Sequence, residues 1–142
     1  RPYHVGDSTI LVVGARGKVK LQTVSHPPVA MAVESGLLDE ADAIHHDERH
    51  IVSNVVGSPE MRIEIGPSLK LAPRDTLMLA SDGLWDNLRL EEIIGRIRKG
   101  KLLAATTALI HAAQDRMHHP QPGEPYKPDD LTVITYRRRR VS

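Results

Sequence analysis

Residues 77–87 read LMLASDGLWDN, and they constrain the fold more than any other part of the chain. The first four residues are apolar and predict a buried strand, which ends abruptly at an acid, Asp82, followed by Gly83. The strand holds the acid on a rigid support, and the glycine lets other groups approach the carboxylate closely. An unpaired carboxylate at the end of a buried strand is costly, and a bound metal ion would compensate for that cost.

Two further acidic segments flank predicted strands. Asp7 follows Gly6 ahead of one strand, and Asp129 and Asp130 precede the last strand. Carboxylate oxygens are the ligands that hard divalent cations such as Mg²⁺ and Mn²⁺ prefer. Three carboxylates at strand ends therefore predict metal-assisted chemistry.

The pattern of apolar residues predicts a mixture of strands and helices. Alternation and apolar runs predict strands at residues 9–14, 18–24, 61–65, 76–80 and 131–136. Repeats of three and four residues and glycine stops predict helices at residues 29–36, 39–46, 102–117 and from about residue 88 to Gly100. Strands with acids at their ends, and helices that cover one sheet face, indicate an α+β layered architecture.

Other sites that use aspartates near a turn are excluded by the residues between them. Asp82 and Asp86 take positions one and five of an EF-hand loop, but Leu84, Asn87 and Ile93 occupy positions three, six and twelve. Leu84 also excludes the Asp-x-Asp motif of haloacid-type phosphotransferases. We expect Asp86 to brace the following turn and Asn87 to cap the next helix.

Four short motifs follow one another along the chain. They are Gly6-Asp7-Ser8, residues 53–57 (SNVVG), residues 79–86 (LASDGLWD) and residues 129–134 (DDLTVI). Their order resembles the type 2C metal-dependent serine/threonine protein phosphatases, in a bacterial-like form, from about residue 5 to about residue 135. The family has a further glycine-rich aspartate motif in its N-terminal half, and nothing in this chain matches it. The resemblance implies that residues 1–142 are the C-terminal portion of a type 2C catalytic domain.

The resemblance implies a fold, an activity and a set of site residues. The fold would be part of an α-β-β-α sandwich of two antiparallel sheets flanked by helices, with the N-terminal half missing. The activity would be hydrolysis of phosphoserine and phosphothreonine with two or three Mn²⁺ or Mg²⁺ ions. Asp82 and Asp129 would hold one metal, and Asp7 with Asp82 another. Gly83 and Asp130 would support them, and Asp130 stands where the family usually has asparagine.

The implied site is incomplete without the missing half, which would supply the remaining ligands and the phosphate-binding arginine. No catalytic residue beyond the metal ligands is expected in this chain. The expected partners are a phosphoprotein substrate, the missing N-terminal half, and other copies of the chain, because strand edges would be uncovered. The alternative is a non-catalytic pseudo-phosphatase that acts as a protein-interaction module, and metal binding distinguishes the two.

Composition excludes several other classes. The net charge of +1 gives no reason to expect nucleic acid or membrane as a partner, and the absence of cysteine excludes disulfides. We expect a cytoplasmic protein, and a chain that begins with Arg1 is consistent with a fragment. Residues 137–140, four arginines, are expected to form a solvated end of the chain. His45, His46 and His50 lie in a polar segment, which favours a solvated surface over a metal site.

Overall fold

The computed structural model describes residues 1–23 and 54–138, which form two antiparallel sheets and three helices. The strands are β1 (Tyr3–His4), β2 (Thr9–Val13), β3 (Val19–Gln22), β4 (Glu64–Ile65), β5 (Thr76–Ala80) and β6 (Val133–Arg137). The helices are α3 (Asp82–Trp85), α4 (Leu90–Ile97) and α5 (Leu102–His118). β1 pairs with β4, and the larger sheet has the strand order β3-β2-β5-β6.

This arrangement confirms the predicted α+β class with two antiparallel sheets and helices outside. β5 matches the predicted strand at residues 76–80, whereas the predicted strand at 61–65 is reduced to the two residues of β4. β5 is strongly apolar because it is a central strand, paired with β2 on one side and β6 on the other. The helices predicted at residues 29–36 and 39–46 lie outside the described residues.

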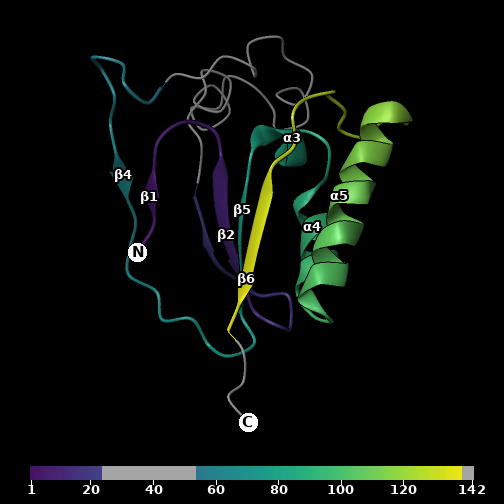
Figure 1. Cartoon of the computed structure of the whole chain (residues 1–142), viewed down its shortest axis with the longest axis horizontal. Coiled ribbons are helices and arrows are strands. Elements are labelled where there is room, and N and C mark those ends of the chain that lie inside the picture. Colours follow the sequence, from purple (N-terminus) through teal and green to yellow (C-terminus); the bar gives the residue numbers. More distant parts are fainter. Residues whose placement is uncertain (24–53, 139–142) are drawn as a thin grey trace.

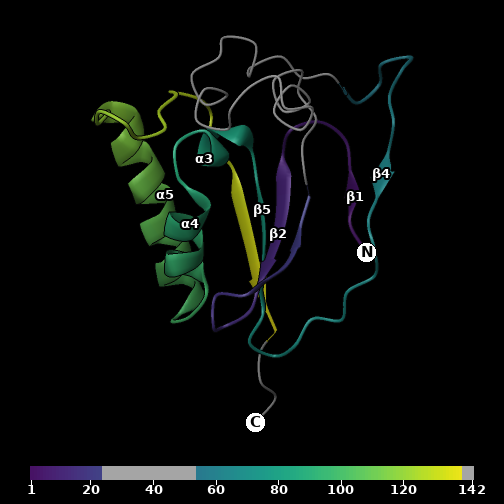
Figure 2. The same cartoon turned by 180° about the vertical axis from the view of Figure 1, so that it is seen from behind.

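The core lies between the four-stranded sheet and the helices. Figures 1 and 2 show α4 and α5 on one side of this sheet and the β1–β4 ribbon on the other. The largest fully buried apolar side chains of the core are Leu11, Val13, Met78, Leu84, Ile93, Ile97 and Leu109. All of them are aliphatic, as expected for a chain with no phenylalanine.

The other face of the sheet carries exposed apolar side chains. Leu79 in β5 and Ile134 in β6 are direct partners in the strand pairing, and both are exposed together with Tyr136. Neighbouring exposed apolar side chains mark a surface that contacts another layer or another molecule. Within the described residues, helices therefore cover one face of the large sheet, and the β1–β4 ribbon on the other side leaves these side chains of β5 and β6 exposed.

Arg137 does not belong to a solvated end, so that prediction is wrong for this residue. Its guanidinium group donates to Thr76 Oγ1 at 2.9–3.0 Å and to the Ile97 carbonyl oxygen at 2.7 Å. It also donates to the carbonyl oxygen of Gly100. These acceptors lie at the start of β5 and at the end of α4, where helix carbonyls lack partners within the helix. Arg137 therefore fastens the end of β6 to both elements.

The longest described helix, α5, packs through one narrow face. Ala105, Leu109 and Ala113 are spaced four residues apart and are buried, whereas Leu103 is 81% exposed. Within residues 1–23 and 54–138, no helix is both long and apolar enough to cross a membrane.

Substitution of Leu109 and Leu103 tests which face of α5 stabilises the fold. Leu109→Ala should lower the free energy of unfolding by about 2–5 kcal/mol, because it leaves a cavity at a fully buried position. Leu103→Ala, the matched control on the same helix, should change it by less than about 0.5 kcal/mol. Urea unfolding measures both, and equal losses would contradict this packing.

Candidate metal centre

The candidate centre lies where β5 runs into α3. Asp82 is the first residue of α3, and the buried Gly83 follows it. A Cβ atom built on Gly83 would collide with the backbone carbonyl oxygen of Asp130. The glycine therefore lets the segment that carries Asp129 and Asp130 pass directly against α3. This contact gives a structural reason for the glycine, which was predicted to support the site.

Ser81 ties the same segment to the end of β5. Its backbone N–H donates to the Thr132 carbonyl oxygen, and its Oγ accepts from the Thr132 N–H, both at 3.0 Å. Its hydroxyl also donates to the carbonyl oxygen of Asp130 at 3.3 Å. Ser81 was not among the predicted site residues, although its hydroxyl directly follows an apolar strand. The acids of both segments are thus held by strand ends that are bonded to each other.

Asn87 is fully buried and clamps the loop at Lys127. Its side-chain amide donates to the carbonyl oxygens of Gly83 at 2.8 Å and of Lys127 at 2.7 Å. Its Oδ1 accepts from the backbone N–H of Lys127 at 2.9 Å. The prediction that Asn87 caps the next helix is wrong, because the N-cap of α4 is Arg89 and the Asn87 side chain binds the loop instead. The clamp fixes the backbone of Lys127 above α3.

Glu92 helps to cap α4, and it is also connected, through Arg116, to the loop that carries Glu124. The backbone N–H of Arg89 donates to the Glu92 carboxylate at 3.0 Å. Arg116 in α5 bonds Glu92 at 2.9 Å and Glu124 in the loop at 3.1 Å. Arg89 also donates to Glu124 at 3.0 Å, and this hydrogen bond, before other effects, lowers the pKa of Glu124. Residues 119–127 are thereby attached to both helices.

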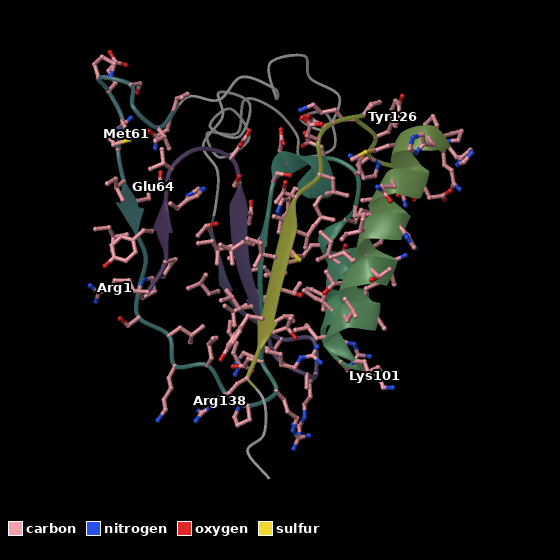
Figure 3. All side chains as sticks on the ribbon, in the orientation of Figure 1. Arg1, Met61, Glu64, Lys101, Tyr126 and Arg138 are labelled. Carbon is pink, nitrogen blue, oxygen red and sulfur yellow. The ribbon has the colours of Figure 1, made fainter. Side chains whose placement is uncertain are left out.

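Lys127 brings three carboxylates together. Its Nζ lies 2.8 Å from Asp129, 3.2 Å from Asp82 and 3.2 Å from Asp86. Burial alone would lower the pKa of Lys127, but the hydrogen bonds that its ammonium group donates to Asp129, Asp86 and Asp82 outweigh burial and raise that pKa above its ordinary value. The group lies at the end of the molecule where Figure 3 labels the neighbouring Tyr126, far from Lys101. Lys127 was not among the predicted site residues, because its sequence context does not distinguish it from a solvated lysine.

Asp7 lies near the same group from the loop between β1 and β2. Burial, and next the negative charge of Asp82, raise the pKa of Asp7 above its ordinary value of 3.8. Asp86 acts in the same direction, and Lys127 opposes it. Asp7 is therefore close enough to the other acids to repel them. The prediction that Asp86 braces the turn agrees with its position at the end of α3, where it also pairs with Lys127.

The carboxylates at this position suit a hard cation, although in this structure they contact the ammonium group of Lys127. Asp82 and Asp129 meet at Lys127, and the side chain of Asp129 accepts from the backbone N–H of Asp130 at 2.8 Å. Asp130 itself is exposed and contributes through its backbone. Among the described residues, no three histidine, cysteine or acidic side chains are close enough to hold a metal ion as they stand. Carboxylate oxygens around one positive charge are nevertheless the chemistry that Mg²⁺ and Mn²⁺ require.

The metal-ligand roles of Asp82, Asp129 and Asp7 stay predictions. The solvated polar segment predicted around His45, His46 and His50 lies outside the described residues.

Comparison with known proteins connects this chain with protein phosphatases. No family model matches it. A Streptococcus pyogenes serotype M6 protein named "Putative protein phosphatase 2C-type" is 31% identical over 96 residues, 64% of this chain and 37% of that protein. The Streptococcus agalactiae serine/threonine phosphatase is 29% identical with a TM-score of 0.75, over 94% of this chain and 52% of that structure.

A third match shows the fold alone. The catalytic domain of the serine/threonine protein phosphatase PstP, solved in complex with two manganese ions, is 21% identical with a TM-score of 0.61. The match covers 94% of this chain and 50% of that structure. This chain thus spans about half the length of the solved phosphatases that it matches. The two streptococcal matches confirm the resemblance to type 2C phosphatases.

Two glycines of helices α3 and α4 provide a matched test of the close approach. Gly83→Ala should lower the free energy of unfolding by about 1–3 kcal/mol, because the new methyl group forces the Asp130 backbone away. Gly95→Ala, in α4 with no atom near the added methyl group, should raise it by about 0.5–1 kcal/mol. Denaturant unfolding measures both. A neutral Gly83→Ala would show that the loop does not lie against α3.

The raised pKa of Asp7 predicts a pH-dependent stability. The folded state binds the Asp7 proton more tightly than the unfolded state does. The free energy of unfolding therefore falls as the pH rises through the raised pKa and this proton is lost. Asp7→Asn should therefore raise the melting temperature at pH 7 in the presence of a chelator. The gain should disappear as the pH falls below about 3.8, where Asp7 is protonated in both states. Asp115→Asn, on the exposed surface of α5, is the control for charge removal. A gain that is independent of pH would refute this origin.

Proposed function

We propose that this chain is the C-terminal portion of the catalytic domain of a metal-dependent protein phosphatase that hydrolyses phosphoserine and phosphothreonine. The observation that carries the proposal is the meeting of Asp82, Asp86 and Asp129, from two distant segments, around one positive charge. It occurs in a chain that is similar to a serine/threonine phosphatase over 94% of its length.

The proposal gives each acid a role. Asp82 and Asp129 would hold one divalent cation, Mn²⁺ or Mg²⁺, and Asp7 would contribute with Asp82 to a further one. A bound divalent cation supplies charge neutralisation at phosphoryl oxygens and activates water as a nucleophile. The chain itself supplies position: Ser81 holds the backbone beside Asp129, and Gly83 allows that backbone to lie against Asp82.

This chain would supply only part of the metal site. The solved phosphatases are about twice as long as the matched region, and the described residues contain no complete group of metal ligands as they stand. We therefore expect the chain alone to bind Mn²⁺ weakly. The exposed apolar face with Leu79, Ile134 and Tyr136 is where we expect the other half of the domain, or a second copy of the chain, to pack.

A non-catalytic interaction module is the second candidate, and one observation favours it. Lys127 already pairs with the three carboxylates, so the group has a charge partner without any metal. The two candidates differ in whether Mn²⁺ binds to the acids and supports hydrolysis.

Hydrolysis of p-nitrophenyl phosphate and of a phosphothreonine peptide tests the proposal. The chain with Mn²⁺ should be slow, and a polypeptide that supplies the other half of a type 2C domain should increase its rate. In the complemented form, Asp82→Asn should lower the rate by about 100-fold, because loss of charge stabilisation by a metal costs several kcal/mol. Asp115→Asn should leave the rate unchanged.

The assay has two outcomes that contradict the proposal. Equal rates for Asp82→Asn and the parent would remove Asp82 from the reaction. Absence of Mn²⁺-dependent hydrolysis in the complemented form would favour the interaction module.

A further inference from the structure

We propose that Lys127 is a built-in competitor of the divalent cation, so that its ammonium group and the metal ion bind the carboxylates of Asp82 and Asp129 in turn. The inference rests on the proposed function, because it concerns the same acids. It adds a regulatory role for a residue of the chain itself: Lys127 would set the metal concentration at which the site fills.

The contacts of Lys127 are those of a bound cation. An ammonium group has three N–H donors, and Nζ of Lys127 lies within 3.2 Å of three carboxylates. Its side chain is 18% exposed, and those of Asp82, Asp86 and Asp129 are 24–32% exposed. The ammonium group therefore lies between the acids, at a position where one cation contacts oxygens of both Asp82 and Asp129.

Charge makes the two occupants mutually exclusive. A protonated amine cannot donate electrons to a metal, and it repels a divalent cation strongly at a separation of a few ångströms. Three carboxylates face one ammonium group, so the group keeps excess negative charge, and Asp7 adds to it. This excess attracts a cation of higher charge than lysine. A divalent ion that binds Asp82 and Asp129 must therefore displace the ammonium group.

The surrounding structure allows that displacement without unfolding the loop. Asn87 fixes both backbone groups of Lys127, so the loop stays in place when the side chain moves. Pro128 further restricts the backbone conformation of the residue before it. The side chain has four rotatable bonds and reaches solvent, and ion pairs at a partly exposed position are individually weak. The moving part is thus the side chain alone.

Calorimetric titration of the 142-residue chain with Mn²⁺ tests the competition. Lys127→Met keeps the length of the side chain and removes its charge, and it should bind Mn²⁺ about tenfold more tightly than the parent. Lys101→Met, at the far end of α5, removes the same charge and should bind like the parent. Asp82→Asn should bind more weakly than the parent.

A labelling experiment on the unmodified chain gives a second readout that needs no variant. Acetic anhydride followed by mass spectrometry reports the reactivity of each amine. Saturating Mn²⁺ should increase the reactivity of Lys127, because its ammonium group leaves the carboxylates. The reactivity of Lys101 should stay the same.

The outcomes separate this inference from the proposed function. Mn²⁺ binding that depends on Asp82, with equal affinity in Lys127→Met and no change in labelling, would overturn the competition and leave the phosphatase proposal intact. Failure of the parent and of Lys127→Met to bind Mn²⁺ would overturn the competition, whereas only the assay of the complemented form decides the phosphatase proposal. If Lys127→Met does not fold, the labelling result decides.

Discussion

The arrangement of the acids depends on one buried amide, that of Asn87. Asp82 begins α3 and Asp86 caps its C-terminal end, whereas Lys127 and Asp129 belong to a loop that returns about forty residues later. The Asn87 side chain joins the two segments by bonding both backbone groups of Lys127 and the Gly83 carbonyl. An aspartate would lack the donor and a leucine would lack both functions, so the joint requires an amide.

The group of acids lowers the stability of the fold locally. Asp7 and Asp82 repel each other, and burial adds to the cost of the charge on Asp7. Lys127 offsets part of this cost through three ion pairs, and the arginine network around Glu124 keeps the loop in position. Such concentrations of like charge are typical of functional sites, because packing alone would not select them.

Much of the fold followed from local patterns, and much of the site did not. β5, α4 and α5 were predictable because their apolar residues repeat with the period of a strand or a helix. The candidate acids Asp7, Asp82 and Asp129 were predictable from their places at strand ends. The contacts of Asn87 and Arg137 were not, since their partners lie 40 and 61 residues away in the sequence. Lys127 had no local signal at all.

The strand order also determines when this fold can form. β5 is one of the two central strands, and its partners β2 and β6 come from opposite ends of the described chain, so that Leu11 pairs with Met78 and Met78 with Thr135. Contacts between such distant residues require closure of long loops before they stabilise anything, which slows folding. During synthesis, one edge of β5 stays unpaired until β6 has left the ribosome. Until then, this edge of an apolar strand can pair with another chain, and it is a segment that a chaperone would bind.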